Sequence, residues 1–387
     1  MRAAAHWLSI LVTVAAAAAA ALVVFPPPNQ PLALLAVVVD EKTFVMMAAA
    51  LLGAALARSS GSRLWMLGQA ILGLTIVGVA LLPPAQAAKL ARERRTTLEW
   101  GRYVTAPVDN APARPSQTLT YAVVDRRALA LDVYRPARTK DPVPAVIVVH
   151  GGGWTAGDKG EAPRASAALA QHGFAVFDVQ YRLAPPPTWR DAVGDVKCAV
   201  GWVKRHARQA SVDVDPARVF LLGRSAGGHL ALLAAYTPED GTLPPSCDAG
   251  DTRVAGVISL YGASDLGAAW QHPGNRRVFD LPSRTSQYVG ATPSTEPDRY
   301  RLLSPIERAT SAAPPTLLIH GGRDAFVPVD QATRLARQLA ALGVPHDLLV
   351  VPYAQHAFDF VSGGLGQQLA EQATLRFLAA PAAAGRT

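Results

Sequence analysis

A serine at position 225 lies in the glycine-rich hexapeptide GRSAGG, which spans residues 223–228. This hexapeptide fits G-x-S-x-G, the sharp turn between a strand and a helix that presents a serine hydroxyl group at the edge of a sheet. Residues 218–222 are mostly apolar and predict a buried strand, and the alanines and leucines after the motif favour a helix. Gly223 and Gly227 lack a Cβ, so strand and helix can approach closely at such a turn. The pattern predicts a nucleophilic serine for acyl transfer, in preference to an ordinary glycine-rich loop.

A second glycine motif, HGGGW at residues 150–154, follows another apolar run that predicts a strand. Consecutive glycines let backbone N–H groups approach a substrate and stabilise the oxyanion that forms when a serine attacks a carbonyl carbon. We expect Gly152 and Gly153 to supply two of these N–H groups. Ala226, the residue directly after the serine, is expected to supply a third.

A serine nucleophile needs a base, and the base needs an acid that orients it. In sheets of this kind the order along the chain is serine, then acid, then histidine. Asp324 follows a predicted strand at 316–320, and His356 lies in the loop after the next strand, so we expect them to be the acid and the base. Asp265, at the end of another strand, and Asp359 are the alternatives for the acid.

Together these motifs make residues 119–380 resemble the α/β-hydrolase superfamily, specifically the hormone-sensitive-lipase-like and BD-FAE-type esterases. The matching segments are HGGGW at 150–154, DVQYRLAP at 178–185, GRSAGGHLAL at 223–232, the run from SP at 304 to HG at 321, and HAFD at 356–359. The resemblance implies a hydrolase of carboxylic esters without a cofactor, acting through the triad Ser225, Asp324 and His356. The sequence contains no metal-binding H-E-x-x-H motif and no phosphate-binding P-loop.

Three residues near these motifs are candidates for the substrate pocket. Trp154 ends the glycine motif, Tyr181 follows a predicted strand, and Arg224 stands beside the serine, where many relatives carry an acidic residue. Core packing is the alternative for the two aromatic residues. We expect His150 and Gly151 to shape the turn, and the Arg224 cation to influence which substrate charge is preferred.

The elements that must position these residues follow an alternating pattern. Apolar runs predict strands at 120–124, 129–134, 145–149, 174–179, 218–222, 254–260, 316–320 and 347–351. The first two predict an antiparallel start, and helical patterns separate most of the others. This alternation predicts a mainly parallel sheet with helices on both faces, the α/β-hydrolase fold. Residues 266–303 interrupt it and are expected to form a small cap insertion within a catalytic domain at 119–387.

The first 88 residues differ in composition and predict a membrane segment. Residues 7–25 and 64–82 are uncharged runs of 19 residues, close to the roughly 20 that a helix needs to cross a bilayer. Residues 43–57 predict a third, shorter span. A cleaved signal peptide followed by a hydrophobic hairpin is the alternative. Residues 89–118 are basic and contain several prolines, which favours a linker to a separable catalytic domain.

The net charge of +8 is not accompanied by any nucleic-acid motif, so attraction to an anionic membrane is the simpler interpretation. The expected partners are an ester substrate and membrane lipid, and no nucleic acid. Arg2, Arg58 and Arg63 favour cytoplasmic ends for the spans that they flank, and thus a multi-pass protein with an extracytoplasmic catalytic domain. The basic cluster at 89–95 favours the opposite orientation, or contact with anionic headgroups.

The chain has two cysteines, Cys198 in a predicted helix and Cys247 in a proline-rich loop. A disulfide between them would suit an exported domain, and a buried free thiol at Cys198 is the alternative. Neither cysteine has the surroundings of a nucleophile.

Two further functions are compatible with the same motifs. The triad also serves amidases such as formamidases, and peptidases of this fold. A membrane-anchored binding protein that has lost catalysis is the third possibility, because folds of this kind host many functions. The complete set of serine, acid, base and oxyanion residues weighs against that third possibility.

Overall fold

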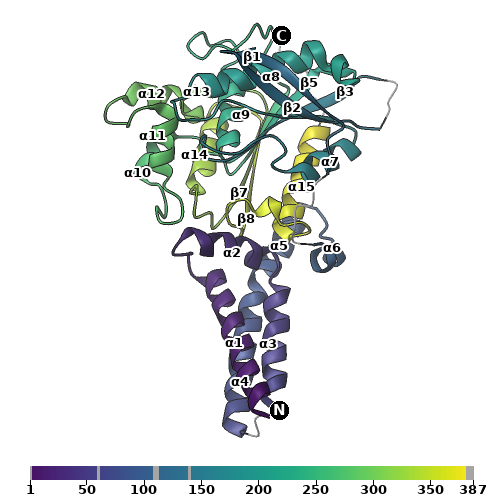
Figure 1. Cartoon of the computed structure of the whole chain (residues 1–387), viewed down its shortest axis with the longest axis vertical. Helices are drawn as coiled ribbons and strands as arrows, with labels where there is room; N and C mark the ends of the chain where they lie inside the picture. The colour runs from purple at the N-terminus through teal and green to yellow at the C-terminus, as the bar shows by residue number, and fades with distance from the viewer. Residues whose placement is uncertain (1, 59–61, 108–112, 138–140, 381–387) are drawn as a thin grey trace.

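The computed structural model describes residues 2–58, 62–107, 113–137 and 141–380. A stalk of three long helices carries an α/β domain at one of its ends (Figure 1). The stalk consists of α1 (Arg2–Val24), α3 (Phe44–Ala57) and α4 (Arg63–Ala80). The N-terminal end of the chain lies at the end of the stalk that is remote from the α/β domain.

The stalk packs small and polar residues together with a few larger apolar ones inside, and it exposes many large apolar residues. Gly53 of α3 lies so close to α1 that a Cβ atom there would come within 2.3 Å of the Thr13 hydroxyl oxygen. That hydroxyl group donates a hydrogen bond to Gln69 Oε1 at 2.6 Å. The outward side chains include these leucines, all more than half exposed: Leu11, Leu51, Leu67 and Leu74. This arrangement is typical of helices that are surrounded by lipid.

The three predicted spans are all helical, but they differ in length. The stretches Ala3–Val24 and Arg63–Glu93 are long and apolar enough to cross a bilayer. The second stretch includes α5 (Leu82–Glu93), which continues α4 beyond the stalk. With 14 residues, α3 is shorter than the roughly 20 residues that a perpendicular span requires.

The α/β domain is built on one sheet with the strand order β1-β2-β4-β3-β5-β6-β7-β8. The strands are β1 (Gln117–Val124), β2 (Arg127–Tyr134), β3 (Val143–Val149), β4 (Ala175–Val179), β5 (Val214–Arg224), β6 (Gly256–Leu260), β7 (Thr316–Gly321) and β8 (His346–Val351). β2 pairs antiparallel with β1 and β4, and all other neighbours are parallel. The eight predicted strands and the α/β-hydrolase architecture are therefore confirmed.

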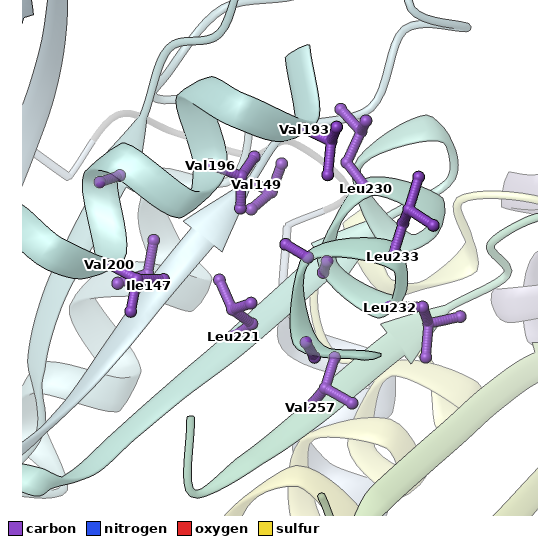
Figure 2. Close-up of a cluster of buried hydrophobic side chains, with 14 of the residues drawn as sticks. Ile147, Val149, Val193, Val196, Val200, Leu221, Leu230, Leu232, Leu233 and Val257 are labelled. Carbon is purple, nitrogen blue, oxygen red and sulfur yellow. The ribbon is translucent and has the colours of Figure 1, made fainter. Parts of the chain in front are cut away.

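Helices cover both faces of this sheet, and the residues of its central strands are therefore buried on both sides. One core layer lies between the sheet and α8 (Asp191–His206), α9 (Ala226–Tyr236) and α14 (Asp330–Ala341). Figure 2 shows part of this layer, with Ile147 and Leu221 of the strands beneath apolar side chains of α8 and α9. The opposite layer packs against α7 (Pro163–Gln171) and α15 (Leu365–Ala379).

Residues 266–303, where we expected a cap insertion, contain three short helices. These are α10 (Leu266–Gln271), α11 (Leu281–Val289) and α12 (Pro297–Leu302), followed by α13 (Pro305–Arg308). They lie together at one side of the domain (Figure 1). Asp265 Oδ1 accepts the Ala268 N–H at 2.9 Å and caps the first of these helices.

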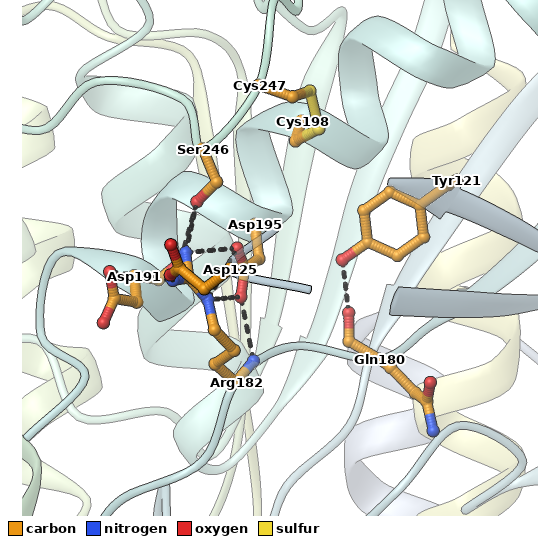
Figure 3. A network of polar contacts seen from close by, with 9 residues as sticks. All are labelled: Tyr121, Asp125, Gln180, Arg182, Asp191, Asp195, Cys198, Ser246 and Cys247. Carbon is orange, nitrogen blue, oxygen red and sulfur yellow. Dashed lines mark hydrogen bonds and ion pairs between the residues drawn. A yellow bond between two sulfur atoms is a disulfide. The ribbon is translucent and has the colours of Figure 1, made fainter. Parts of the chain in front are cut away.

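Cys198 and Cys247 form a disulfide that ties α8 to the loop before β6. Next to it, Arg182 binds Asp195 at 2.8 Å, and Ser246 accepts a second hydrogen bond from the same guanidinium group at 2.7 Å (Figure 3). Asp125 completes the cluster by binding Arg182 at 3.0 Å. The segment after β4, which begins with Tyr181, is therefore fixed from several sides.

The region between stalk and domain differs from the expected linker. Helix α5 continues to Glu93, and α6 (Trp100–Thr105) follows it. Arg102 in α6 binds Glu371 of α15 at 2.9 Å. The N–H group of Glu99 donates to Gln368 Oε1 at 2.7 Å. The segment 89–118 thus contains the end of α5 and the helix α6, and contacts at Glu99 and Arg102 hold it on the catalytic domain.

The helix α2 (Gln30–Glu41) connects the stalk to the catalytic domain through buried carboxyl groups. Gln355 Nε2 donates a hydrogen bond to Asp40 Oδ2 at 3.1 Å, and the Gly366 N–H donates to Glu41 Oε2 at 2.9 Å. Asp40 and Glu41 are only 6% and 4% exposed. Removing residues 1–88 would therefore uncover part of the catalytic domain, in contrast to the separable domain that the sequence favours.

The burial of Glu41 predicts a pH-dependent attachment of the stalk. Burial raises the pKa of this carboxyl group from 4.5 to about 8, and the nearby Asp40 adds to the increase. The folded chain then holds a proton that the unfolded chain releases, so stability is lost as the pH rises from 4.5 towards 8. We expect Glu41→Gln, which is neutral throughout, to reduce the fall in Tm between pH 5 and pH 8, measured on the full chain in detergent. Glu93→Gln, at an exposed carboxyl group, should leave that fall unchanged, and an equal effect of both variants would contradict the interpretation.

Candidate active site

Ser225 lies at the turn between β5 and α9 in a strained backbone conformation. Its φ is 53° and its ψ is −119°, outside the regions that most residues adopt. A Cβ atom on Gly223 would lie 2.1 Å from the Gly227 carbonyl oxygen, and one on Gly227 would lie 2.1 Å from the Val149 carbonyl oxygen. Both glycines are therefore required by the close approach of β3, β5 and α9. This is the geometry that the G-x-S-x-G pattern predicts.

The three residues predicted as a triad come together at the carboxyl ends of the parallel strands. His356 Nε2 lies 3.0 Å from Ser225 Oγ, and His356 Nδ1 lies 2.7 Å from Asp324 Oδ2. In the tautomer that fits both contacts, Nδ1–H donates to the carboxylate and Nε2 accepts from the serine hydroxyl group. These distances suit proton transfer from the serine to the histidine.

The backbone of its own loop fixes the carboxyl group of Asp324. Asp324 Oδ1 accepts the N–H groups of Phe326 and Val327 at 2.8 and 2.9 Å, which leaves Oδ2 for His356. Burial alone would raise the pKa of Asp324, but the charge of His356 and hydrogen bonds from His320 and His356 lower it below its ordinary value. The carboxyl group is therefore an anion at neutral pH, as an orienting acid requires.

Neither alternative acid contacts His356. Asp265 Oδ2 accepts a hydrogen bond from Arg334 at 2.6 Å. Asp359 Oδ2 binds Arg224 at 2.6 Å, and Asp359 Oδ1 accepts the Tyr261 hydroxyl group. Among the three candidate carboxylates, only Asp324 has the geometry of a triad acid.

The glycine loop holds Gly152 and Gly153 in conformations that favour glycine, and its first glycine, Gly151, lies against Ser225. The φ angles of Gly152 and Gly153 are +104° and +60°. Among the hydrogen bonds of the described residues, none is donated by the N–H of Gly152 or Gly153. Ala226 is the first residue of α9, so its N–H has no acceptor within the helix. These three N–H groups are available to an oxyanion.

The loop itself is held by residues that surround its first glycine. The Gly151 N–H donates to Glu161 Oε2 at 2.8 Å. The Tyr181 hydroxyl group donates to the carbonyl oxygens of His150 and Gly151, and its ring stacks on His150 with a centroid distance of 4.2 Å. Burial lowers the pKa of His150 to about 4, so the stacked imidazole is neutral. Glu161 was not predicted, because no sequence signal connects it with the motif ten residues earlier.

Trp154 and Tyr181 support the loop and do not line an open pocket. Each is only 2% exposed. The Trp154 indole N–H donates to His229 Nδ1 at 3.1 Å, and its ring stacks on Tyr288 at 5.1 Å. The core-packing alternative therefore fits both residues, and the expectation that they wall the pocket is not met.

Arg224 also departs from the expectation, because its side chain does not reach the reaction centre. It forms an ion pair with Asp359 in which the two side chains are only 6% and 8% exposed. Both residues line a cavity of about 330 Å³ between α7 and α15, and none of the triad residues is part of that lining. The guanidinium group is thus unavailable for selecting substrate charge.

This buried ion pair predicts a large effect on stability. Arg224→Met leaves Asp359 without its cation in a buried position, and we expect a loss of about 3–5 kcal/mol in the free energy of unfolding. The measurement is urea unfolding of the full chain in detergent. The double variant Arg224→Met with Asp359→Leu removes both charges and should recover most of the loss. A single variant as stable as the unmodified chain would show that the pair contributes little.

Two phenylalanines that the sequence analysis did not single out lie next to the triad. The Phe326 ring stacks on the His356 ring at 5.0 Å, with an angle of 9° between the planes. Phe279 of the cap region stacks on Phe326 at 5.3 Å. A Cβ atom on Gly153 would lie 3.0 Å from Phe279. The two rings therefore extend from the base to the oxyanion loop.

Comparisons with known proteins agree with this architecture. The sequence pattern of the BD-FAE family matches residues 131–339, more than half of the chain. The probable carboxylic ester hydrolase LipM of Mycobacterium tuberculosis is 34% identical over 241 residues, which cover 61% of this chain and 54% of LipM. Esterase LipC of the same organism is 34% identical over 247 residues, 62% of this chain and 59% of LipC. The chain thus spans little more than half the length of these curated relatives.

A solved structure shows the same fold. The propionate-bound esterase from the planctomycete Thermogutta terrifontis is 26% identical and has a TM-score of 0.53. The match covers 67% of this chain and 91% of that protein. The residues that match the BD-FAE family, 131–339, lie within the α/β domain.

Proposed function

Because this chain belongs to the BD-FAE family and has the α/β-hydrolase fold, we propose that it is a serine hydrolase that cleaves carboxylic esters through an acyl-enzyme. The observation that carries the proposal is the continuous set of contacts from Asp324 through His356 to Ser225, at 2.7 and 3.0 Å. The N–H groups of Gly152 and Gly153, which donate to no acceptor in the described part of the chain, support it. The esterases among its relatives support the choice of an ester as substrate.

In the first half of the reaction, the Ser225 hydroxyl group attacks the ester carbonyl carbon while His356 Nε2 takes its proton. Asp324 holds the imidazole in the required tautomer and stabilises the imidazolium ion. The N–H groups of Gly152, Gly153 and Ala226 stabilise the oxyanion, and losing one such donor typically costs about 10²–10³ in rate. His356 then gives its proton to the alcohol, which leaves.

In the second half, a water molecule takes the place of the alcohol. His356 removes a proton from this water as its oxygen attacks the acyl carbon, and the same N–H groups stabilise the second oxyanion. The bond between the acyl group and Ser225 Oγ breaks, and the proton returns from His356 to Oγ. The products are an acid and an alcohol, and each step uses only residues of the chain and water.

A fluorophosphonate that carries a reporter group tests the proposal directly. The reagent reacts with activated serines, so the full chain in detergent should take up one equivalent at the peptide that contains Ser225. Prior incubation with p-nitrophenyl butyrate should slow the labelling, and protein unfolded in urea should not be labelled. Labelling elsewhere, or none together with no release of p-nitrophenol, would contradict the proposal.

We also propose that the stalk anchors the enzyme in a membrane and that the catalytic domain lies outside the cytoplasm. The exposed leucines of the stalk and the two long apolar stretches support anchoring. Arg58 and Arg63 flank the end of the stalk remote from the catalytic domain, which is the cytoplasmic end by the positive-inside tendency. The disulfide Cys198–Cys247 is consistent with an oxidising compartment.

Alkaline phosphatase fused after residue 387 should be active in cells. An inactive alkaline phosphatase fusion together with an active green fluorescent protein fusion would indicate the opposite orientation, with the catalytic domain in the cytoplasm.

A further inference from the structure

The sheet edge that carries the candidate active site is the edge that faces the stalk. The loops with Asp324 and His356 follow the carboxyl ends of β7 and β8, and α2 lies between these strands and the stalk (Figure 1). Tyr353, in the loop after β8, packs against the apolar cluster inside the stalk. A ligand that approaches Ser225 from this side therefore passes the top of the stalk.

Two contacts connect the N-terminal segment to opposite sides of the candidate site. On one side, Gln355, the neighbour of His356, donates to Asp40 at 3.1 Å. On the other side, Asn275 Nδ2 donates to the Pro27 carbonyl oxygen at 3.0 Å. Asn275 lies in the cap, four residues before Phe279, the ring that reaches the oxyanion loop. The segment 25–42 thus borders the site from the cap to the histidine loop.

The surfaces on both sides of this border are apolar. Phe279 and Phe326 are half-buried, so part of each ring is open beside the oxyanion loop and His356. On the stalk side, the apolar side chains of Phe25, Leu34 and Leu35 are 64%, 54% and 49% exposed. Exposed leucines on a short helix at the end of a transmembrane bundle are typical of a helix that lies in the membrane interface. Apolar side chains therefore lie on both sides of this border, on the segment next to the stalk and beside the reacting groups.

We infer that residues 25–42 form one wall of the substrate entrance, and that the substrate is a long-chain acyl ester taken from the bilayer. The inference rests on the proposed function, because it assigns the substrate class of that same site. The acyl chain lies along Phe279 and Phe326, and the ester carbonyl group reaches Ser225. The contact between Asn275 and Pro27 keeps the cap aligned with the stalk at this entrance.

Surface dilution tests where the substrate comes from. The full chain is reconstituted into phosphatidylcholine vesicles that contain p-nitrophenyl palmitate, and the total amount of ester is held constant while more phosphatidylcholine is added. Below saturation, a tenfold lower mole fraction of ester in the bilayer should lower the rate by about tenfold. A rate that stays constant under dilution overturns the inference. Because dilution also lowers the ester concentration in water, a second arrangement places p-nitrophenyl palmitate in separate vesicles that lack the protein. An equal rate in that arrangement means that the substrate is taken from water, and it also overturns the inference. p-Nitrophenyl acetate in the same vesicles reports on the chemistry alone, so its absence of turnover would count against the proposed function instead.

A variant at the cap tests the assigned entrance. Asn275→Ala removes the hydrogen bond to Pro27, and we expect the ratio of palmitate to acetate turnover to fall by at least about threefold. Gln287→Ala is the matched control, because Gln287 is exposed on the cap and bonds only to Ser283 of its own helix among the described residues. The assignment of residues 25–42 as the entrance would be overturned if the palmitate rate of the unmodified chain falls on dilution but Asn275→Ala keeps the same ratio of palmitate to acetate turnover.

Discussion

Ser225→Ala should lower kcat for p-nitrophenyl butyrate by about 10⁶-fold, the scale on which loss of the nucleophile acts in a serine hydrolase. The reason is that the acyl-enzyme cannot form without Oγ, so neither its formation nor its hydrolysis can take place. Only the stabilisation of the oxyanion by backbone N–H groups would remain, together with binding of the ester. The fold should be unaffected, because the side chain loses one oxygen atom and its contact with His356.

The measurement compares the full chain with Ser225→Ala and with Ser294→Ala, all in the same detergent. Ser294 is exposed in the cap and serves as the matched control. Tm values for the three proteins should agree, and fluorophosphonate labelling should disappear only with Ser225→Ala. Activity of Ser225→Ala within tenfold of the unmodified chain would mean that the turnover belongs to another group or to a contaminant.

Gly227→Ala should lower kcat/KM by about 10²-fold or more, although the residue takes no part in the chemistry. A Cβ atom at this position would lie 2.1 Å from the Val149 carbonyl oxygen and 2.3 Å from that of His150. Backbone atoms cannot be displaced as a flexible side chain can, so α9 must move away from β3. That movement separates Ser225 and Ala226 from the glycine loop, and the oxyanion donors no longer converge.

A second readout separates this displacement from unfolding. Overpacking of this kind typically costs about 1–3 kcal/mol, so Gly227→Ala should remain folded below its lowered Tm. Gly241→Ala is the matched control, because a Cβ atom there would meet nothing within 4 Å. Wild-type activity in Gly227→Ala would show that the turn accommodates a Cβ atom without displacing Ser225. That result would contradict the close packing of α9 against the end of β3.

The candidate triad could be predicted from the sequence because each of its residues lies next to a recognisable local pattern. Ser225 is fixed by the glycines on either side, and Asp324 and His356 each follow an apolar run that reads as a strand. Parallel strands bring their carboxyl ends to one edge, so local positions become a spatial arrangement. The same reasoning predicted all eight strands of the sheet.

Side-chain directions and distant partners could not be predicted in this way. The sequence places Arg224 beside the nucleophile, but in the structure its side chain pairs with a distant carboxylate. Its partner, Asp359, is 135 residues away. Asp40 and Gln355 are 315 residues apart, and no periodicity connects a carboxyl group near the stalk with an amide next to the histidine. Contacts between the N-terminal segment and the catalytic domain were not predicted for that reason.

These long separations also determine the order in which the protein can be assembled. A chain is synthesised from its N-terminus, and earlier parts generally fold first. Asp40 and Glu41 leave the ribosome 315 and 325 residues before the groups that cover them, Gln355 and Gly366. The two carboxyl groups of α2 therefore remain uncovered until the segment with Gln355 and Gly366 has been made. Nascent chains that stop before residue 355 lack both groups and leave this surface uncovered.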